Sequence, residues 1–220
     1  MKIKWLGHAS FLITSKAGVK VITDPYAVGR GINYAPIKEG ADVVLVSHDH
    51  SDHNNASAIQ GKPEVVKGNV TKSVKGISFQ GVATYHDASQ GQQRGSNTIF
   101  CFTLDGMRVC HLGDLGHVLS SGQVKEIGAI DILLVPVGGF FTIDASAASQ
   151  VCDQLKPKVI VPMHFKIPDC DYPIAGVEDF LKGKKNIRKI AGSEIELERE
   201  KLPDATEIVV LQPALSRTKP

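Results

Sequence analysis

The sequence lacks the long apolar runs of membrane proteins. No stretch approaches the roughly 20 consecutive apolar residues that a membrane-spanning helix needs. The N-terminus is basic, but Gly7 and His8 interrupt its apolar stretch and no small-residue cleavage site follows. We therefore expect these residues to belong to the mature protein and not to a signal peptide. Together these absences predict a cytoplasmic protein without a membrane partner.

The sequence also lacks a large excess of positive or negative charge and has no closely spaced pair of cysteines. The net charge of +2 is too small to argue for nucleic acid as a partner. The local exception is a basic run at 182–189, which we interpret as a solvated helix end, with a phosphate or nucleic-acid contact as the alternative. The four cysteines show no C-x-x-C spacing, which favours reduced core thiols. Cys170, close to the candidate site, stays open as a reactive thiol.

A chain of 220 residues without repeats, linkers or low-complexity tracts fits one domain, 1–220, with a frayed tail at 216–220. Short β-prone runs dominate the first hundred residues, and Asp105-Gly106 is a strong hairpin signal. Strands are predicted at 3–6, 10–14, 19–23, 41–47, 77–82, 97–104, 107–112, 131–135, 159–162, 194–198 and 208–211, and helices at 54–60, 120–127, 144–155 and 177–181. The pattern indicates an α+β fold of two largely antiparallel β-layers with helices packed outside.

The strongest chemical signal is the segment 48–53, which reads H-x-H-x-D-H directly after the apolar run 41–47. In an extended or loop backbone His48 and His50 project to the same side, and Asp52 and His53 follow in the turn. Three imidazoles and a carboxylate within six residues form a dense set of nitrogen and oxygen ligands. The segment therefore predicts a zinc-type metal site.

Further donors follow other predicted strands. His86 stands after the strand near Ala83, Asp114 follows the strand that ends at Leu112, and His164 follows Val161-Pro162-Met163. Strand ends that open onto one rim are where sites on sheet scaffolds are built. We expect these three side chains to join the cluster at 48–53.

The order of these residues resembles that of the metallo-β-lactamase superfamily, and the match spans residues 48–164. Gly7-His8-Ala9-Ser10-Phe11 and Thr23-Asp24-Pro25 resemble its branch of small metal-dependent hydrolases, which includes L-ascorbate-6-phosphate lactonase. One departure is Leu115, which stands where the family commonly has threonine. That change removes no ligand, but it weakens any inference about the substrate.

The resemblance implies a four-layer αββα sandwich in a single domain, with two metals between the sheets at one edge. It also implies a role for each donor. The first metal would be bound by His48, His50 and His86, the second by Asp52, His53 and His164, and Asp114 would bridge the two. Zinc is the expected metal, with manganese or iron as alternatives.

Other residues near the motifs have two interpretations each. His8 lines the site as a proton donor or caps a turn, and Asp24 orients a metal-binding histidine or forms an Asp-Pro turn. His111 is predicted to be a buried, hydrogen-bonded strand histidine, whereas His117 reaches the substrate or lies on the surface. The two phenylalanines of the segment 138–141 are predicted to pack in the core, with a pocket wall as the alternative.

The resemblance implies a hydrolase that cleaves a small ester, lactone or phosphodiester with a hydroxide held by two metal ions. Asp52 and His8 are the candidate catalytic residues, and the expected partner is a small-molecule substrate. The alternatives are a nuclease acting on RNA or DNA, a di-iron redox protein, and a non-catalytic metal-binding protein. Exposed edge strands leave a homo-oligomer open.

Overall fold

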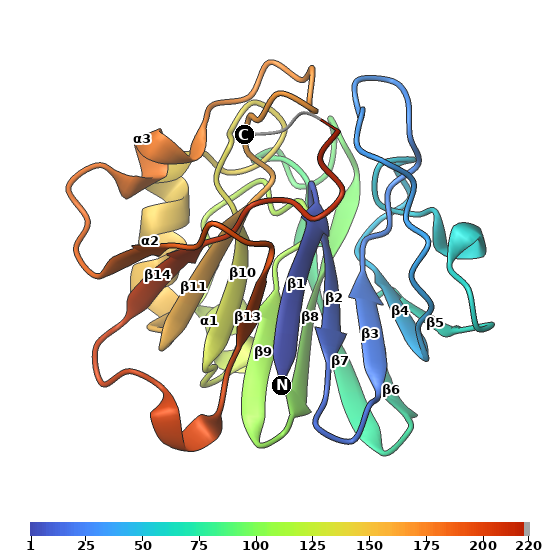
Figure 1. The fold of residues 1–220 in the computed structure, drawn as a ribbon. Coiled ribbons are helices and arrows are strands. Elements are labelled where there is room, and N and C mark those ends of the chain that lie inside the picture. Colours follow the sequence, from blue (N-terminus) through green and yellow to red (C-terminus); the bar gives the residue numbers. More distant parts are fainter. Residues whose placement is uncertain (218–220) are drawn as a thin grey trace.

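Two β-sheets stacked face to face form the centre of the molecule in the computed structural model, which describes residues 1–217 (Figure 1). The smaller sheet has the strand order β13 (Glu194–Glu196), β1 (Lys2–Gly7), β2 (Ser10–Thr14), β3 (Lys20–Thr23), β4 (Val43–Val46) and β5 (Glu64–Lys67). The larger sheet has the order β12 (Ile187–Lys189), β14 (Glu207–Val210), β11 (Val159–Met163), β10 (Ile132–Pro136), β9 (Met107–His111), β8 (Ser96–Leu104), β7 (Ile77–Tyr85) and β6 (Thr71–Val74).

Both sheets are mixed, so the prediction of largely antiparallel layers was wrong for part of each sheet. The strands β13, β1, β2 and β3 pair antiparallel, but β3, β4 and β5 pair parallel. The larger sheet is antiparallel from β6 to β9 and parallel from β9 through β10, β11 and β14 to β12. Hairpin turns such as Asp105-Gly106 announce antiparallel pairs in the sequence. Parallel pairs are joined by long crossovers, which carry no such local signal.

The strand β4 shows how the core holds the candidate site. Its residues alternate, so that Val43 and Leu45 face the core between the sheets while Val44 and Val46 face a second cluster outside the smaller sheet. All four side chains are buried, and burial of each contributes roughly 1.5–3 kcal/mol. The strand that leads into the segment 48–53 is therefore fixed on both faces.

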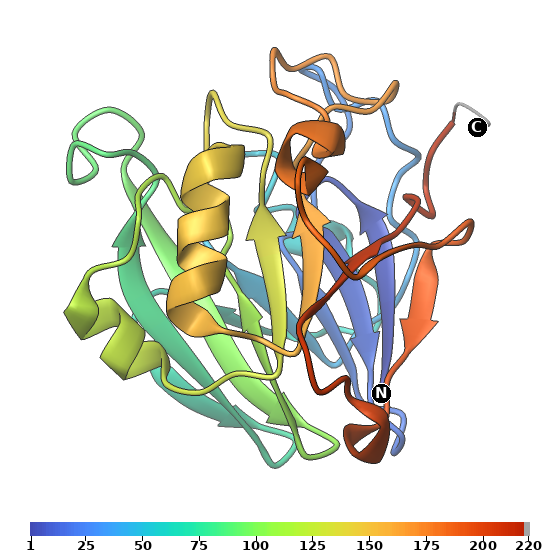
Figure 2. The same cartoon turned by 90° about the vertical axis from the view of Figure 1, so that its left-hand side faces the viewer.

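Helices cover the outer face of the larger sheet, as Figure 2 shows. They are α1 (Ser121–Ile127), α2 (Ala145–Leu155) and α3 (Val177–Leu181), with α1 packed on β7 and α2 on β10. Ser120 and Asp144 cap α1 and α2 through their side chains, as the sequence predicted for Asp144. Among the described residues, none of these helices has the length and apolar character to cross a membrane.

The αββα class is confirmed, although the layer outside the smaller sheet is thin. It consists of the loop 24–41 and the 3₁₀ turn η1 (Ala56–Ala58), which replaces the helix predicted at 54–60. A second 3₁₀ turn, η2 (Arg199–Lys201), precedes β14. The sequence prediction missed β5, β6 and β12, which are short and largely exposed.

The predicted frayed tail, 216–220, falls partly on described residues. The Ser216 hydroxyl and the Arg217 backbone N–H both donate to the Asp169 carboxylate, the latter at 3.1 Å. This part of the tail is attached to the protein, and residues 218–220 lie outside the described residues.

Candidate metal centre

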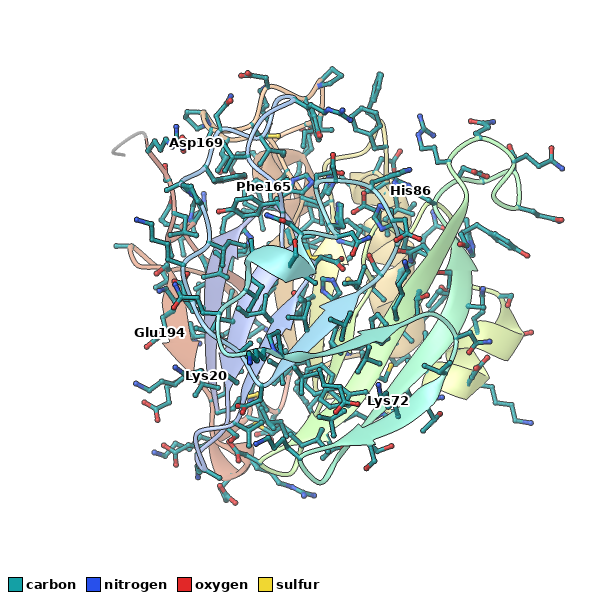
Figure 3. The ribbon with its side chains drawn as sticks, turned by 90° about the vertical axis from the view of Figure 1, so that its right-hand side faces the viewer. Lys20, Lys72, His86, Phe165, Asp169 and Glu194 are labelled. Atoms are coloured by element: carbon teal, nitrogen blue, oxygen red, sulfur yellow. The ribbon has the colours of Figure 1, made fainter. Side chains whose placement is uncertain are left out.

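The candidate ligands lie where strands of both sheets end at one edge of the sandwich. β4 runs into the segment 48–53, β7 ends just before His86, β9 ends three residues before Asp114, and β11 ends just before His164. Figure 3 shows His86 near the upper end of the strands, whereas Lys72 lies towards the opposite end. The fold therefore brings together side chains that are far apart in the sequence.

Asp114 lies at the centre of this arrangement. Its Oδ2 atom is 3.2 Å from His53 Nε2, 3.2 Å from His86 Nε2 and 3.3 Å from His164 Nε2. His48 Nε2 is 3.9 Å away. The carboxylate is buried, so four imidazoles from three separate stretches of chain face one charged group.

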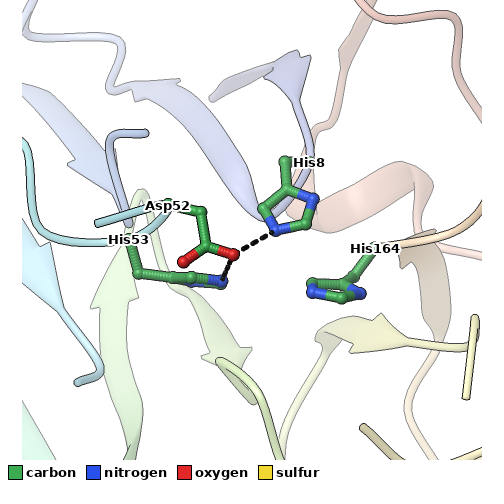
Figure 4. A group of neighbouring side chains, drawn as sticks. All are labelled: His8, Asp52, His53 and His164. Atoms are coloured by element: carbon green, nitrogen blue, oxygen red, sulfur yellow. Dashed lines mark ion pairs between the residues drawn. The ribbon is translucent and has the colours of Figure 1, made fainter. Parts of the chain in front are cut away.

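The donors form two main groups, and a third group of His48, His53 and Asp114 connects them. The outer group is His48, His50 and His86, and the inner group is His8, Asp52, His53 and His164. The ligand atoms within each group lie within 4.8 Å of one another. Figure 4 shows the inner group, in which the Asp52 carboxylate lies between the His8 and His53 rings.

Within the described residues, many of these buried atoms lack a hydrogen-bond partner. They are His8 Nε2, His48 Nε2, His53 Nε2, His86 Nδ1, both ring nitrogens of His164, and Asp114 Oδ1. A folded protein rarely leaves buried polar atoms unpaired, because each costs roughly 1–3 kcal/mol. Imidazole nitrogens and carboxylate oxygens are the ligand set of zinc and similar cations. The donor set therefore fits divalent metal ions.

Asp24 fixes the ring orientation of the inner group. This buried carboxylate accepts hydrogen bonds from His53 Nδ1 at 3.0 Å and from His111 Nε2 at 2.9 Å. A carboxylate of low pKa only accepts, so Nδ1 of His53 carries the hydrogen. With Nδ1 held by Asp24, His53 presents Nε2 to Asp114, and this is the nitrogen that would bind a metal.

Asp24 also fixes a ring of the outer group, through a serine. The Ser47 hydroxyl donates to Asp24 Oδ2 at 2.7 Å, and its oxygen lies 2.9 Å from His48 Nδ1. A hydroxyl has one hydrogen, which Asp24 takes, so Ser47 accepts from His48 Nδ1. His48 Nε2 is thereby left free, as His53 Nε2 is.

Burial sets the protonation of the neutral rings. It lowers the pKa of His48 to about 3 and that of His8 to about 4. Burial alone would also lower the pKa of His53, but the Asp114 and Asp24 carboxylates raise it well above the usual value. His8 and His48 are thus neutral at physiological pH, which is the form that binds metal.

The backbone at Asp114 requires a glycine before it. Gly113 has a φ of +54°, and a Cβ atom at this position would lie 2.5 Å from Asn97 Oδ1. The same Asn97 oxygen accepts the Asp114 backbone N–H at 2.9 Å. The close approach of β8 to this turn therefore positions the Asp114 carboxylate.

A hollow of about 270 Å³ opens beside the donors. It is lined by His50, Asp52, His86, Asp114 and His164 and by three further side chains, Arg94, Phe141 and Tyr172. The Tyr172 hydroxyl donates to Asp52 Oδ2 at 3.2 Å, and this oxygen also lies 3.3 Å from His8 Nε2.

Known proteins are similar to this chain in sequence and in fold. Residues 2–164 match the family model described as a beta-lactamase superfamily domain. The chain belongs to the beta-lactamase superfamily. A relative named UPF0173 metal-dependent hydrolase, from Archaeoglobus fulgidus, is 32% identical over 84% of this chain and 91% of its own length. This relationship places the chain in the branch of the superfamily made up of small metal-dependent hydrolases.

Solved structures of superfamily proteins agree with this assignment. A crystal structure from Thermotoga maritima, described as a zinc-dependent hydrolase of the metallo-β-lactamase superfamily, is 38% identical. It has a TM-score of 0.80, and the match covers 96% of this chain and 97% of that one. Igni18 from Ignicoccus hospitalis shares the fold at a TM-score of 0.63 and 21% identity, covering 96% and 95% of the two chains.

All seven residues that the superfamily pattern predicts as ligands lie together in the structure. His8 lines the site as well, where its ring centroid is 4.0 Å from that of His164. Asp24 orients His53, and the prediction that His111 is a buried, hydrogen-bonded strand residue is confirmed. His117 lies apart from both donor groups and accepts the Tyr85 backbone N–H at 3.2 Å.

Sequence reasoning did not single out Arg94 and Tyr172, which line the hollow. For Phe141 the prediction of core packing was wrong, and the alternative of a pocket wall agrees with the structure. Phe140 is 63% exposed, so the core prediction was wrong for it too. Arg94 lies in a polar, glycine-containing loop directly after His86, and that position was the available signal.

Proposed function

We propose that this chain is a metal-dependent hydrolase that uses two divalent cations to cleave a small ester, lactone or phosphodiester, with zinc as the expected metal. The observation that carries the proposal is the position of Asp114 between two groups of donors whose buried nitrogens lack protein partners. The names of the relatives support the hydrolase class. They leave the substrate open.

Each donor has an assigned part in this proposal. His48, His50 and His86 would hold one cation, Asp52, His53 and His164 the other, and Asp114 would face both. Bound cations of this kind lower the pKa of water from 15.7 to about 7 and polarise the bond to be cleaved. The Asp24 and Ser47 hydrogen bonds keep the imidazoles in the binding tautomer, so little reorganisation is needed.

Asp52 and His8 are proposed to handle the proton of the attacking water. Burial alone would raise the pKa of Asp52, but the nearby His8 and His53 imidazoles lower it, so the carboxylate is ionised and can accept. His8 Nε2 lies 3.3 Å from the accepting oxygen. Tyr172 donates to the same oxygen and holds the carboxylate in place.

The shape and charge of the site support a small-molecule substrate over RNA or DNA. The hollow of about 270 Å³ is lined on one side by Phe141, and it shares no lining residue with the basic run at 182–189. Charges of that run are partly satisfied within the protein. Arg188 pairs with Glu207 at 3.0 Å, and Lys189 pairs with Glu178 at 2.9 Å.

The direct test combines metal analysis of the purified protein with a screen of esters, lactones and phosphodiesters. Two equivalents of zinc or manganese and turnover of one bond class support the proposal. Two irons without hydrolysis would indicate redox chemistry instead. Full metal content without any turnover would indicate a metal-binding protein that is not an enzyme.

A further inference from the structure

The pocket beside the donors contains one charged side chain that the proposed chemistry does not use. Arg94 lines the hollow together with Phe141 and Tyr172, and it belongs to neither donor group. It also lines a second hollow of about 210 Å³ on its other side, next to Ser96 and Thr98. An arginine remains charged at any physiological pH, so it adds a fixed positive charge to this wall.

The loop that carries Arg94 is held at a defined position. The buried Asp87 carboxylate accepts backbone N–H bonds from Ser89, Gly91, Gln93 and Arg94, at 2.7 to 3.0 Å. The base of the loop is closed where the His86 N–H donates to the Gly95 carbonyl at 3.0 Å. Arg94 is thereby held in a loop that begins directly after the donor residue His86.

The Arg94 guanidinium lies over the Phe141 ring, with its central carbon 5.6 Å from the ring centroid. Phe141 in turn contacts Tyr172 edge-on, at 5.2 Å between centroids. No carboxylate among residues 1–217 forms an ion pair with Arg94. The N–H donors of its guanidinium are therefore available to a ligand, and the Phe141 ring limits where the side chain can lie.

Resting on the proposed hydrolase function, we infer that Arg94 binds a negatively charged group of the substrate, a carboxylate or a phosphate, at the wall of the pocket that it forms with Phe141. The guanidinium offers two parallel N–H donors that match either group. Phe141 contacts the apolar part of the molecule, and the bond to be cleaved lies towards Asp52 and Asp114. The substrate class is thus a small anionic ester, lactone or phosphodiester.

The kinetic test uses pairs of substrates that share the cleavable bond and differ only in a distal charged group. For carboxylic esters, 4-nitrophenyl butyrate is paired with 4-nitrophenyl hemisuccinate, and corresponding pairs are used for the other bond classes. We expect the wild-type protein to favour the anionic member at least tenfold in kcat/KM. Arg94→Ala should raise KM for that member by about 10- to 100-fold and leave the neutral member within about twofold.

Two further variants separate the role of the guanidinium from that of charge or folding. Arg94→Lys keeps the charge without the paired donors, so we expect a partial recovery of KM. Arg188→Ala removes an exposed arginine on β12 that pairs with Glu207, and it should change neither member of a pair. Equal losses for anionic and neutral substrates in Arg94→Ala, or no preference in the wild type, would overturn the inference.

A binding measurement tests the same site without turnover. Calorimetric titration of the zinc-loaded protein with malonate and with inorganic phosphate should give affinities that fall about tenfold in Arg94→Ala. The stronger of the two ligands identifies the charged group. Equal affinity in both proteins refutes the role of Arg94. Arg94-dependent binding without hydrolysis of any substrate supports the anion site and counts against the hydrolase proposal alone.

Discussion

Two hollows within residues 1–217 differ in how firmly their charged side chains are positioned. The hollow beside α2 has a volume of about 560 Å³ and is lined by Lys156, Lys184 and Lys185. The hollow at the metal centre has about 270 Å³ and is lined by imidazoles and carboxylates at the ends of strands. The larger hollow carries its charge on long, mostly exposed stems, whereas the smaller one carries it on short, mostly buried side chains.

The comparison shows that the volume of a hollow does not indicate its chemical function. A lysine stem loses up to about 2 kcal/mol of side-chain entropy when it is ordered, so the exposed stems of Lys156 and Lys185 are costly to fix beside α2. At the metal centre, strands buried on both faces fix the backbone, and Asp24 and Ser47 fix the rings. Catalysis depends on positions held before the substrate arrives, which the smaller hollow provides.

The largest effect should come from Asp114→Ala. Loss of the carboxylate removes the group that faces both donor sets. We therefore expect turnover to fall more than about 10³-fold, which exceeds the decrease in kcat usually seen when one transition-state hydrogen-bond donor is removed. Bound-metal analysis should show that metal is lost as well. Retained metal stoichiometry in this variant would contradict a bridging role.

Asp144→Ala is the matched control, because the same substitution is made at the N-cap of α2. Its side chain accepts the Ala147 N–H at 2.8 Å, and Asp144 belongs to neither donor group. Loss of this cap should cost about 1 kcal/mol of unfolding free energy. Metal content and turnover should stay at the wild-type level.

Removal of metal should lower the thermal stability of the whole protein. A ligand present at 1,000 times its dissociation constant stabilises the folded state by about 4 kcal/mol, so chelation should lower Tm by roughly 8–16 °C for a chain of this size. The measurement is a thermal melt with and without EDTA, followed by addition of zinc. An unchanged Tm would mean that the unpaired nitrogens at the centre bind no metal.

Asp24→Asn and Ser47→Ala should separate the two donor groups. Loss of a partner that orients a ligand typically costs 10- to 100-fold in metal affinity. Asp24→Asn weakens the support of His53 directly and of His48 through Ser47, so both metal equivalents should bind more weakly. Ser47→Ala should weaken only the equivalent bound by the outer group. If the two variants lose the same affinity at both positions, the hydrogen-bond path from Asp24 to His48 is not functional.

How far the sequence predicted this molecule depends on whether the signal was local. The ligands at 48–53 and the strand-end donors His86, Asp114 and His164 were found because residue type and strand position are both visible in sequence. Asp24 was left ambiguous because its four hydrogen-bond donors, on Ser47, His53 and His111, lie 23 to 87 residues away along the chain. Phe141 was misplaced because a wall residue and a core residue have the same apolar character.

The smallest effect should come from the larger hollow, where Lys184→Ala tests the comparison from the other side. Lys184 donates to Ser149 Oγ at 2.7 Å and lies 4.6 Å from the Phe180 ring centroid, contacts worth about 1 kcal/mol together at a partly exposed site. Urea unfolding should detect this loss, and kcat and KM should be unchanged. A decrease in turnover beyond twofold would show that the lysine-lined hollow communicates with the metal centre, and volume would then have been the better guide to function.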